Sequence, residues 1–425
     1  MACVNRLHKI GGVARVGIIA DDLTSAADGG APFARAGHRV LVGFGSGAPP
    51  SVQGGDVVAL DLDSRAGGAA AASALAAEAG LRLRRVPLLI KTVDSTLRGH
   101  VGAEVAAVLL ASGRRVALVA PAFPAAGRTT RDGMQLVDGV PVHRTAFAHD
   151  PRHPVSGSRV ADLFLGAGLE PVAELAGADV RDQGRVRTAL AAARVVVADA
   201  GTDADLDALV ASAIEDEGVL WIGSPGIAQA LARASPARRT APSASAPDAR
   251  SPLVLVGSLH PASRAQVGAL VETLGARPVE IDAGHAASDT RGAEIERACA
   301  VCRDEAGSGR PVVVLSAPVG APGAAGAVAS VLAEVGRRLV AEGLVDGLVA
   351  TGGDTARAAA RALGAEALHL LREPEPGVAL GEIAGPHPLP VITKAGGFGD
   401  TGALVRLCAA LQGLTLPASE EAQPA

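Results

Sequence analysis

The 425-residue sequence contains no tyrosine, and aromatic residues make up only 2% of it, although 48% of its residues are hydrophobic. Alanine, valine, leucine and glycine must therefore fill its interior. Small aliphatic side chains suit parallel sheets covered by helices, and they argue against an aromatic-rich β-sandwich. A chain of this length is also too long for one compact core, which predicts two domains.

Cysteine is scarce as well. The four cysteines, Cys3, Cys299, Cys302 and Cys408, are too few for a disulfide framework. Cys299 and Cys302 form a C-x-x-C pair, but the surrounding "AEIERACAVCRDE" predicts a helix. A redox motif would lie at a strand-to-helix turn, and a zinc site would need a second pair of ligands. We expect a buried or half-buried helical pair without chemistry.

The chain also lacks a surplus of positive charge, with a net charge of −5 and a pI near 6.1. This composition excludes a broadly basic face for nucleic acid. No apolar run approaches the length of a membrane span. The apolar stretch near the N-terminus is too short for a signal peptide, so we expect a cytoplasmic protein. We expect a small-molecule substrate, and the sequence is compatible with a homo-oligomer without indicating one.

Lysine is nearly absent, since Lys9, Lys91 and Lys394 are the only lysines among 39 basic residues. Arginine is used at all other basic positions except the histidines, so we expect each remaining lysine to have a specific role. Lys9 falls in the predicted N-terminal tail. Lys91 and Lys394 fall in the most motif-like segments of the chain.

Apolar runs alternate with helical patterns along the chain, which predicts two α/β domains, each with a mostly parallel, helix-flanked sheet. We predict an N-terminal domain over 12–234, a Pro-, Ser- and Ala-rich linker over 235–251, a C-terminal domain over 252–416 and a disordered tail over 417–425. Two such domains in series predict an active site in the interdomain cleft, beyond the carboxyl ends of the strands. The less regular segment 127–160 is predicted to be a large active-site loop.

Polar residues follow the predicted strands of the first domain. Asp21 and Asp22 come directly after "GIIA", and "KTVDSTLRG" (91–99) includes the end of the strand "PLLIKT". An arginine such as Arg98 matches a carboxylate with two parallel hydrogen bonds, and aspartates accept hydrogen bonds from hydroxyls. An aspartate can also take a proton from an attacking hydroxyl or hold a metal. These strand ends predict a site for a small polar ligand.

Structural roles would also explain these residues. Asp22 could cap the helix that follows it, and Asp94 or Ser95 could do the same. Arg98 could pair with Glu104 on a helix face. Capping does not account for both aspartates of the doublet, nor for a lysine in a chain that avoids lysine.

Three histidines, His143, His149 and His153, cluster in "VHRTAFAHDPRHP". Their spacing matches no standard zinc pattern. We expect a solvated or ligand-contacting loop there, and the sequence assigns no metal ligands.

The predicted strands of the second domain end in glycine-rich turns: "GSLHPASRAQ" (257–266), "TGGDTARAA" (351–359) and "KAGGFGDTG" (394–402). Such a turn presents backbone N–H groups and a helix N-terminus, an arrangement that binds phosphate. One turn is weak evidence, but three in one domain predict a nucleotide site. The sequence has neither a P-loop nor a dinucleotide fingerprint.

Together these segments resemble the four-carbon acid sugar kinase family, a group of ATP-dependent kinases that act on tetronic acids. The resemblance spans residues 17 to about 412, and its motifs occur in family order. In the first motif, Ser25 stands where the family usually has glycine. The matching segments are "ADDLTSAAD" (20–28), "KTVDSTLRGHVGAE" (91–104), "PAFPAAGRTTRDG" (121–133), "GSLHPASRAQ", "TGGDTARA" and "ITKAGGFGD".

The resemblance implies that the N-terminal domain binds the sugar acid and the C-terminal domain binds ATP. Asp22 or Asp94 would orient or deprotonate the attacking hydroxyl, and Lys394 with Mg²⁺ would neutralise charge on the transferring phosphate. The residues expected around the tetronate are Asp21, Asp22, Lys91, Asp94, Ser95 and Arg98. Those expected around the nucleotide are Ser258, Gly352, Gly353, Asp354, Thr355, Gly396 and Gly397.

The expected activity is transfer of the ATP γ-phosphate to the terminal (4-) hydroxyl of a four-carbon sugar acid. The segment 91–104 is more similar to members that phosphorylate D-threonate or D-erythronate than to 3-oxo-tetronate kinases, which remain the alternative. A sugar-acid or nucleotide sensor without turnover is a rival from another class. A dehydrogenase or aldolase is a further rival, although the sequence has no NAD fingerprint and Lys91 is the only interior Schiff-base candidate outside the predicted ATP domain.

Overall fold

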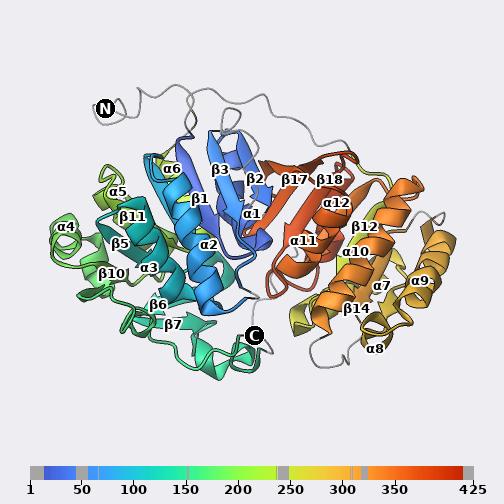
Figure 1. The fold of residues 1–425 in the computed structure, drawn as a ribbon, viewed down its shortest axis with the longest axis horizontal. Coiled ribbons are helices and arrows are strands. Elements are labelled where there is room, and N and C mark those ends of the chain that lie inside the picture. Colours follow the sequence, from blue (N-terminus) through green and yellow to red (C-terminus); the bar gives the residue numbers. More distant parts are fainter. Residues whose placement is uncertain are drawn as a thin grey trace, which may run out of the picture. The chain divides into compact units, whose positions relative to one another are not determined.

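The chain divides into two compact units, Met1–Ser243 and Ala244–Ala425. Each unit is α/β with a helix-flanked, mostly parallel sheet, which confirms the predicted fold class (Figure 1). The division falls inside the predicted linker 235–251. Most of this linker and all of the predicted tail lie outside the residues that the structure describes. This computed structural model describes residues 14–44, 56–65, 67–150, 153–235, 237, 248–306, 308, 310–316 and 324–414.

The main sheet of the first unit is parallel at every pairing between its described strands. These strands are β1 (Val16–Ala20), β2 (Val40–Phe44), β3 (Val57–Asp61), β4 (Leu88–Thr92), β5 (Val116–Ala120), β9 (Val172–Leu175), β10 (Val195–Ala198) and β11 (Val219–Gly223). They are arranged in the order β2-β3-β1-β4-β11-β5-β10-β9. Because β1 lies between β3 and β4, with Ile19 level with Leu60 and Lys91, the carboxyl ends of three strands meet at one edge.

Helices cover both faces of this sheet. They are α1 (Leu23–Arg35), α2 (Ala69–Arg82), α3 (Val101–Ser112), α4 (Gln183–Ala192), α5 (Asp203–Ala213) and α6 (Pro225–Ala234). Ile19 belongs to the core shared with α2 and α3, whereas its neighbour Ile18 points to α1. A Cβ at Gly29 of α1 would lie 2.8 Å from the Thr92 side chain, so glycine allows α1 to approach the strand ends closely.

The segment 127–160 contains a small antiparallel sheet, so the prediction of an irregular loop is wrong for this part. Its strands are β6 (Arg128–Arg131), β7 (Met134–Val137) and β8 (Val140–Pro141). The first connection is Asp132-Gly133, and both residues have positive φ angles, 51° and 71°. An Asp-Gly pair is the expected signal for such a hairpin turn. Short 3-10 helices in and around this segment are η3 (Pro124–Ala126), η4 (Val142–Arg144), η5 (Ala146–His149), η6 (Ala161–Leu163) and η7 (Gly177–Arg181).

The sheet of the second unit is parallel except at one edge. Its strands are β12 (Pro252–Val256), β13 (Val279–Ile281), β14 (Val312–Ser316), β15 (Gly347–Thr351), β16 (Ala367–Arg372), β17 (Val378–Ala384) and β18 (Pro390–Lys394). Their order is β13-β14-β12-β15-β18-β17-β16. The pairs β18–β17 and β17–β16 are antiparallel, so the sheet is mostly parallel, as predicted.

Helices again lie on both faces. They are α7 (Pro261–Leu274), α8 (Ala283–Ala286), α9 (Arg291–Ala306), α10 (Ala325–Ala341), α11 (Gly353–Ala362) and α12 (Ala403–Leu411). One core joins α7 and α12 to Val254 and Ile392 of the sheet, while Gly336 of α10 approaches Leu253 and Leu255 on the other face. None of the described helices is long and apolar enough to cross a membrane.

The C-x-x-C pair lies within α9, as predicted. Cys299 and Cys302 are both buried and free of disulfides. Burial raises the pKa of the Cys302 thiol to about 12, which leaves it protonated and unreactive at neutral pH.

Candidate active site

The aspartate doublet follows directly after β1. Asp22 is the N-cap of α1, since its Oδ1 accepts hydrogen bonds from the Ser25 N–H (2.7 Å) and the Thr24 hydroxyl (2.9 Å). The capping role considered for Asp22 is therefore present. Asp21 is only 3% exposed and takes no part in the cap. Its carboxylate binds Arg65 instead, so capping does not explain the doublet.

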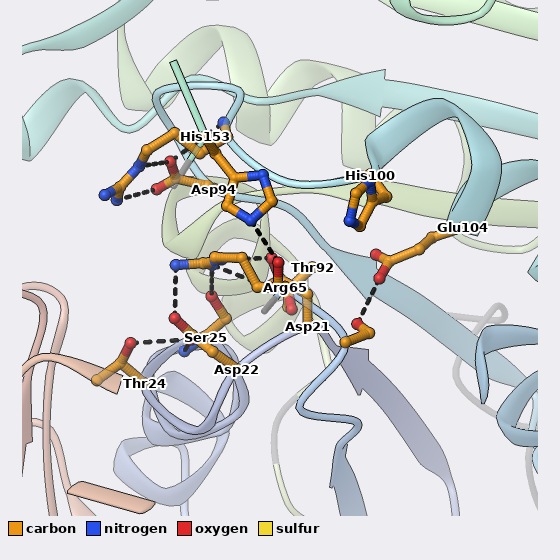
Figure 2. A network of polar contacts seen from close by, with 12 residues as sticks. Asp21, Asp22, Thr24, Ser25, Arg65, Thr92, Asp94, His100, Glu104 and His153 are labelled. Atoms are coloured by element: carbon orange, nitrogen blue, oxygen red, sulfur yellow. Dashed lines mark hydrogen bonds and ion pairs between the residues drawn. The ribbon is translucent and has the colours of Figure 1, made fainter. Parts of the chain in front are cut away.

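Arg65 is the main residue of this site that the sequence analysis missed. Its Nε and Nη2 donate to the two carboxylate oxygens of Asp21 at 2.7 and 2.9 Å, and its Nη1 lies 2.5 Å from Oδ2 of Asp22. The Nη2 also donates to Ser25 Oγ (3.2 Å), so the serine that replaces the family's usual glycine adds a partner. In Figure 2 these four side chains point toward one another. Arg65 closely follows β3, the neighbour of β1. Because ligands in open α/β sheets bind beyond the carboxyl ends of the strands, its position in the sequence could have indicated a role in the site.

Charge pairing offsets burial at both residues. Burial works to raise the pKa of Asp21, but Arg65 and Lys91 hold it below its ordinary value. Burial works to lower the pKa of Arg65, but Asp21 and Asp22 raise it well above its ordinary value. The pair is therefore ionised at neutral pH.

A second carboxylate–arginine pair lies in the turn after β4. Arg98 donates from Nε to Asp94 Oδ2 (2.6 Å), and its Nη1 donates to Asp150 Oδ2 (3.1 Å). The Arg98 guanidinium also lies 5.1 Å from the centre of the Phe147 ring, in cation–π range. Burial works to raise the pKa of Asp94, but Arg98 holds it well below the usual range.

These contacts rule out two of the structural alternatives. Arg98 pairs with Asp94 and Asp150 and not with Glu104. No helix begins at Asp94 or Ser95, because the next helix, α3, begins at Val101. The turn has an unusual backbone in which Gly99 adopts a φ of 96°, and a Cβ there would lie 3.1 Å from Asp21 Oδ2. The turn after β4 thus packs directly against Asp21.

Lys91 lies at the end of β4 and is completely buried. Its Nζ lies 2.9 Å from Oε2 of Glu104, which is 2% exposed, and donates to the Thr92 carbonyl at 2.6 Å. The Ser64 hydroxyl donates to the other oxygen of Glu104. The Lys91 ammonium is thus occupied by protein groups, and a direct contact with substrate stays a prediction.

Ser95 has a buried hydroxyl that no described residue satisfies. The residue is 3% exposed, and its Oγ has no hydrogen-bond partner in the described part of the chain. Its carbonyl accepts a hydrogen bond of 2.7 Å from Nε2 of Gln135, a fully buried residue of β7. Buried hydroxyls are normally paired, so a ligand group is a natural partner for Ser95.

The histidine cluster contributes one residue to the surroundings of this site. A ring nitrogen of His153 contacts the Arg65 carbonyl, and the ring lies 5.3 Å from that of His100 (Figure 2). His143 instead bonds Ser158 (2.6 Å), and His149 is exposed. Over the described ranges no group of three or more His, Cys, Asp or Glu side chains could hold a metal ion.

The three glycine turns of the second unit meet around Ser258. A Cβ at Gly396 would lie 2.2 Å from Ser258 Oγ, and a Cβ at Gly257 would lie 2.0 Å from Thr355 Oγ1. Gly352 has a φ of 92°, and a Cβ there would lie 3.9 Å from Ser258 Cβ. The short contacts at Gly396 and Gly257 leave no room for a Cβ without a shift of the neighbouring hydroxyl, and the positive φ of Gly352 favours glycine. Gly353 and Asp354 are the first residues of α11, and Gly397 follows Gly396, so the predicted nucleotide residues fall on turns that contact one another.

Comparison with known proteins places the two candidate regions in a family. The sequence model of a sugar-binding N-terminal domain matches residues 16–231, and that of a nucleotide-binding C-terminal domain matches residues 253–404. A protein named D-threonate kinase from Bordetella bronchiseptica is 39% identical over 412 residues, which cover 93% of this chain and 97% of the relative. The chain belongs to the four-carbon acid sugar kinase family. The carboxylate–arginine site lies in the region matched by the sugar-binding domain, and the glycine turns lie in the region matched by the nucleotide-binding domain.

Other members of the four-carbon acid sugar kinase family carry different substrate names. A protein named D-erythronate kinase from Heliobacterium modesticaldum is 31% identical over 446 residues, covering 97% of this chain and all of the relative. A protein named 3-oxo-tetronate kinase from Pseudomonas fluorescens is 30% identical over 415 residues, covering 90% of this chain and 94% of the relative. These two relatives are 31% and 30% identical to the chain, against 39% for the D-threonate kinase from Bordetella bronchiseptica.

Proposed function

We propose that this protein is an ATP-dependent kinase that phosphorylates the terminal hydroxyl of a four-carbon sugar acid, with D-threonate or D-erythronate as its substrate. The observation that carries the proposal is the buried site at the ends of β1, β3 and β4. There, Asp21 pairs with Arg65 and Asp94 pairs with Arg98. The buried hydroxyl of Ser95, next to Asp94 in the chain, has no hydrogen-bond partner among the described residues. Such a site offers cations for a carboxylate and acceptors for several hydroxyls. The greater identity to the D-threonate kinase supports a tetronate over a 3-oxo acid.

Arg98 is the proposed anchor for the substrate carboxylate. One side of its guanidinium is held by Asp94 of the same turn, and the Nη1 on the other side binds Asp150. The Asp150 carboxylate is chemically equivalent to the carboxylate of a sugar acid. The substrate would therefore take the position of Asp150 at Nη1, with Asp94 still orienting the guanidinium.

Asp22 is the proposed partner of the attacking hydroxyl. Its side chain is 13% exposed, and its position is fixed by Nη1 of Arg65 at 2.5 Å and by the cap hydrogen bonds of its Oδ1. Asp21 and Asp94 are bound by arginines that lower their pKa values, so they are weak bases. In phosphoryl transfer the nucleophile needs orientation more than a strong base, because the transition state is loose. Asp22 would orient the terminal hydroxyl and accept its proton as the bond to phosphorus forms.

The turns around Ser258 are the proposed site for ATP, and the hydroxyls of Ser258 and Thr355 are available donors there. Mg²⁺ would be held mainly by the nucleotide phosphates, as is usual for this ion. Bound in that way, Mg²⁺ neutralises charge on the phosphates. We further propose that the two sites act together across a cleft between the domains. We also propose that the protein works in the cytoplasm and that both of its substrates are small molecules.

The test is ADP release from Mg-ATP with a panel of D- and L-threonate, D- and L-erythronate, 3-oxo-tetronates and the matching neutral tetroses. We expect turnover with one or two of the tetronates and none with the neutral sugars. Turnover with 3-oxo-tetronates alone would favour the alternative kinase activity. Binding of both ligands without ADP release would overturn the kinase and leave a sensor.

A further inference from the structure

The loop after β18 has nearly all of its carbonyl groups turned toward buried side chains. Lys394 is completely buried, and its Nζ donates to the carbonyls of Ala395 and Phe398, both at 2.9 Å. Ser263 of α7 is also completely buried, and its hydroxyl donates to the Gly396 carbonyl at 2.8 Å. These contacts account for three carbonyls of the loop.

A single buried amide holds the rest of the loop. Gln266 of α7 is 0% exposed, and its Nε2 lies 3.0 Å from the carbonyl oxygens of Phe398 and Gly399 and 2.9 Å from that of Asp400. One NH₂ group therefore faces three consecutive carbonyls. This convergence fixes the orientation of the peptide planes between 398 and 401.

The carbonyl contacts determine where the backbone N–H groups point. In a trans peptide the C=O and the following N–H point in opposite directions. With the carbonyls of residues 395, 396, 398, 399 and 400 directed at Lys394, Ser263 and Gln266, the next N–H in each peptide is directed away from these side chains. Successive N–H groups on one side of a glycine-rich turn form a concave anion site.

We propose that Lys394, Gln266 and Ser263 are positioning residues that turn the carbonyls of loop 395–400 inward, so that the loop presents its N–H groups to the phosphates of the nucleotide. The inference rests on the proposed ATP site and assigns Lys394 a different task from direct contact with the transferring phosphate. Its ammonium binds two carbonyls of the loop and is fully buried.

The acidic side chain of the loop is paired with an arginine, and the neighbouring turns add donors for an anionic ligand. Asp400 is the one carboxylate in this loop, and Arg406 of α12 pairs with it at 3.0 Å. Arg406 also pairs with Glu375 at 2.6 Å. The turns that contact the loop bring the hydroxyl of Ser258 and the N-terminus of α11, where the helix dipole favours negative charge.

The test compares ADP with adenosine, because only ADP reaches the proposed N–H groups with phosphates. Binding of both is measured by isothermal titration calorimetry to the full-length protein and to the variants Gln266→Leu, Ser263→Ala and Lys394→Met. A hydrogen bond from a backbone N–H group to a charged phosphate contributes about tenfold or more to affinity. We expect ADP affinity to fall by about tenfold or more in Gln266→Leu and Lys394→Met and less in Ser263→Ala, with adenosine affinity within about twofold of wild type.

Gln135→Leu is the matched control, since Gln135 is also fully buried and also donates to backbone carbonyls, but in the first unit. We expect it to leave ADP affinity unchanged and to raise KM for the sugar acid. The conservative variant Ser263→Thr keeps the hydroxyl and should retain ADP affinity within about twofold of wild type.

The outcomes separate the inference from the function on which it rests. If wild-type protein binds ADP no more tightly than adenosine, the proposed nucleotide site is wrong. If wild type prefers ADP but the variants do so equally, the positioning role is wrong. Parallel loss of ADP and adenosine in folded variants would also overturn it, because that result indicates a general structural role.

Discussion

Each of the aspartates Asp21 and Asp94 has an arginine within 2.7 Å, so the candidate sugar-acid site is held together by charge pairs before any substrate arrives. Arg65 ties the doublet to the end of β3, and Arg98 ties the turn after β4 to Asp150. Such pairs fix the positions of acceptors and donors that a flexible side chain would lose. We therefore expect binding of the sugar acid to be sensitive to the loss of a single guanidinium group, that of Arg65 or Arg98.

Replacing Arg98 with alanine should reduce kcat/KM for the acid substrate by about 10- to 100-fold, the usual contribution of a charge-assisted hydrogen bond. The loss should appear mainly in KM, because the carboxylate is remote from the reacting hydroxyl and is bound equally in ground and transition states. Arg98→Lys should recover part of the loss, since lysine keeps the positive charge but cannot donate two parallel hydrogen bonds to a carboxylate. Steady-state kinetics of ADP release measures all of these.

The control for this prediction is Arg233→Ala, which removes a half-exposed arginine that pairs with Asp207 at 2.7 Å on the surface. Its kinetics should match those of wild type. Normal catalytic efficiency in Arg98→Ala would contradict the proposed carboxylate anchor.

The lowered pKa of Asp94 predicts the pH dependence of stability. A carboxyl whose pKa is lower in the folded protein stabilises it above the ordinary pKa of 3.8, and this contribution is lost as the pH falls through the folded-state value. Asp94→Asn removes the contribution. We expect the free energy of unfolding of wild type to fall more steeply than that of Asp94→Asn below about pH 4, as measured by urea unfolding from pH 7 to 3. Parallel curves would contradict the assigned pKa shift.

At the residue scale, the sequence indicates residues that the structure brings together where each one closely follows its own strand. Asp21, Asp22, Asp94 and Arg98 were predicted from their positions at strand ends. Asp150 could not be, because it reaches Arg98 from 52 positions along the chain through the fold of segment 127–160. A contact of that kind depends on tertiary structure that no local pattern contains.

At the scale of elements, β4 and α3 are joined by a buried ion pair as well as by apolar packing. Lys91 on β4 and Glu104 on α3 are 0% and 2% exposed at the side chain, with Nζ and Oε2 2.9 Å apart. Burying a charge costs desolvation free energy unless the charge is paired, so Lys91 and Glu104 each offset part of that cost for the other. The pair accounts for a buried cation at position 91.

Breaking this pair from one side should be strongly destabilising. We expect Lys91→Met or Glu104→Leu to lower the free energy of unfolding by about 3–5 kcal/mol, because the remaining partner is left buried and unpaired. The double variant Lys91→Met/Glu104→Leu should lose less than the sum of the two single losses. Chemical denaturation with a double-mutant cycle measures this coupling.

A surface pair provides the comparison. Arg303 and Glu342 are 2.7 Å apart, at least as close as the buried pair, but they are 41% and 36% exposed at the side chain. Arg303→Ala should leave the free energy of unfolding nearly unchanged, because a surface ion pair is screened by solvent. If the buried variants cost equally little, Lys91 is not held by Glu104 in solution, and a direct role with substrate regains support.

The elements that the sequence predicted well are those with continuous apolar runs. β1, β4, β12 and β18 are buried on both faces, and their runs are unbroken. β16 and β17 were missed because they form an antiparallel edge in which exposed and half-buried residues such as His369 and Glu382 interrupt the pattern. The small sheet β6–β8 was missed because its strands are short and rich in Arg, Thr and Gln, although its Asp-Gly turns were visible.

At the scale of the whole molecule, the two units have separate cores and separate candidate sites. The core around α7 and α12 is formed by residues 249–411 alone. Every described group that shapes the glycine turns, including Ser258, Gln266 and Lys394, also lies in the second unit. On the proposed assignment, phosphoryl transfer requires both units, whereas nucleotide binding requires only the second.

The segment 244–425, produced alone, should therefore bind ADP with an affinity within about tenfold of the full-length protein while showing no ADP release with any acid. Far-UV circular dichroism establishes that the segment is folded, and calorimetry measures its affinity. The reciprocal segment 1–243 should bind the acid substrate and also release no ADP. A folded 244–425 segment that fails to bind ADP would mean that the first unit supplies part of the nucleotide site. That result would place the missing contacts between the units and would redirect the search for them to residues of the first unit.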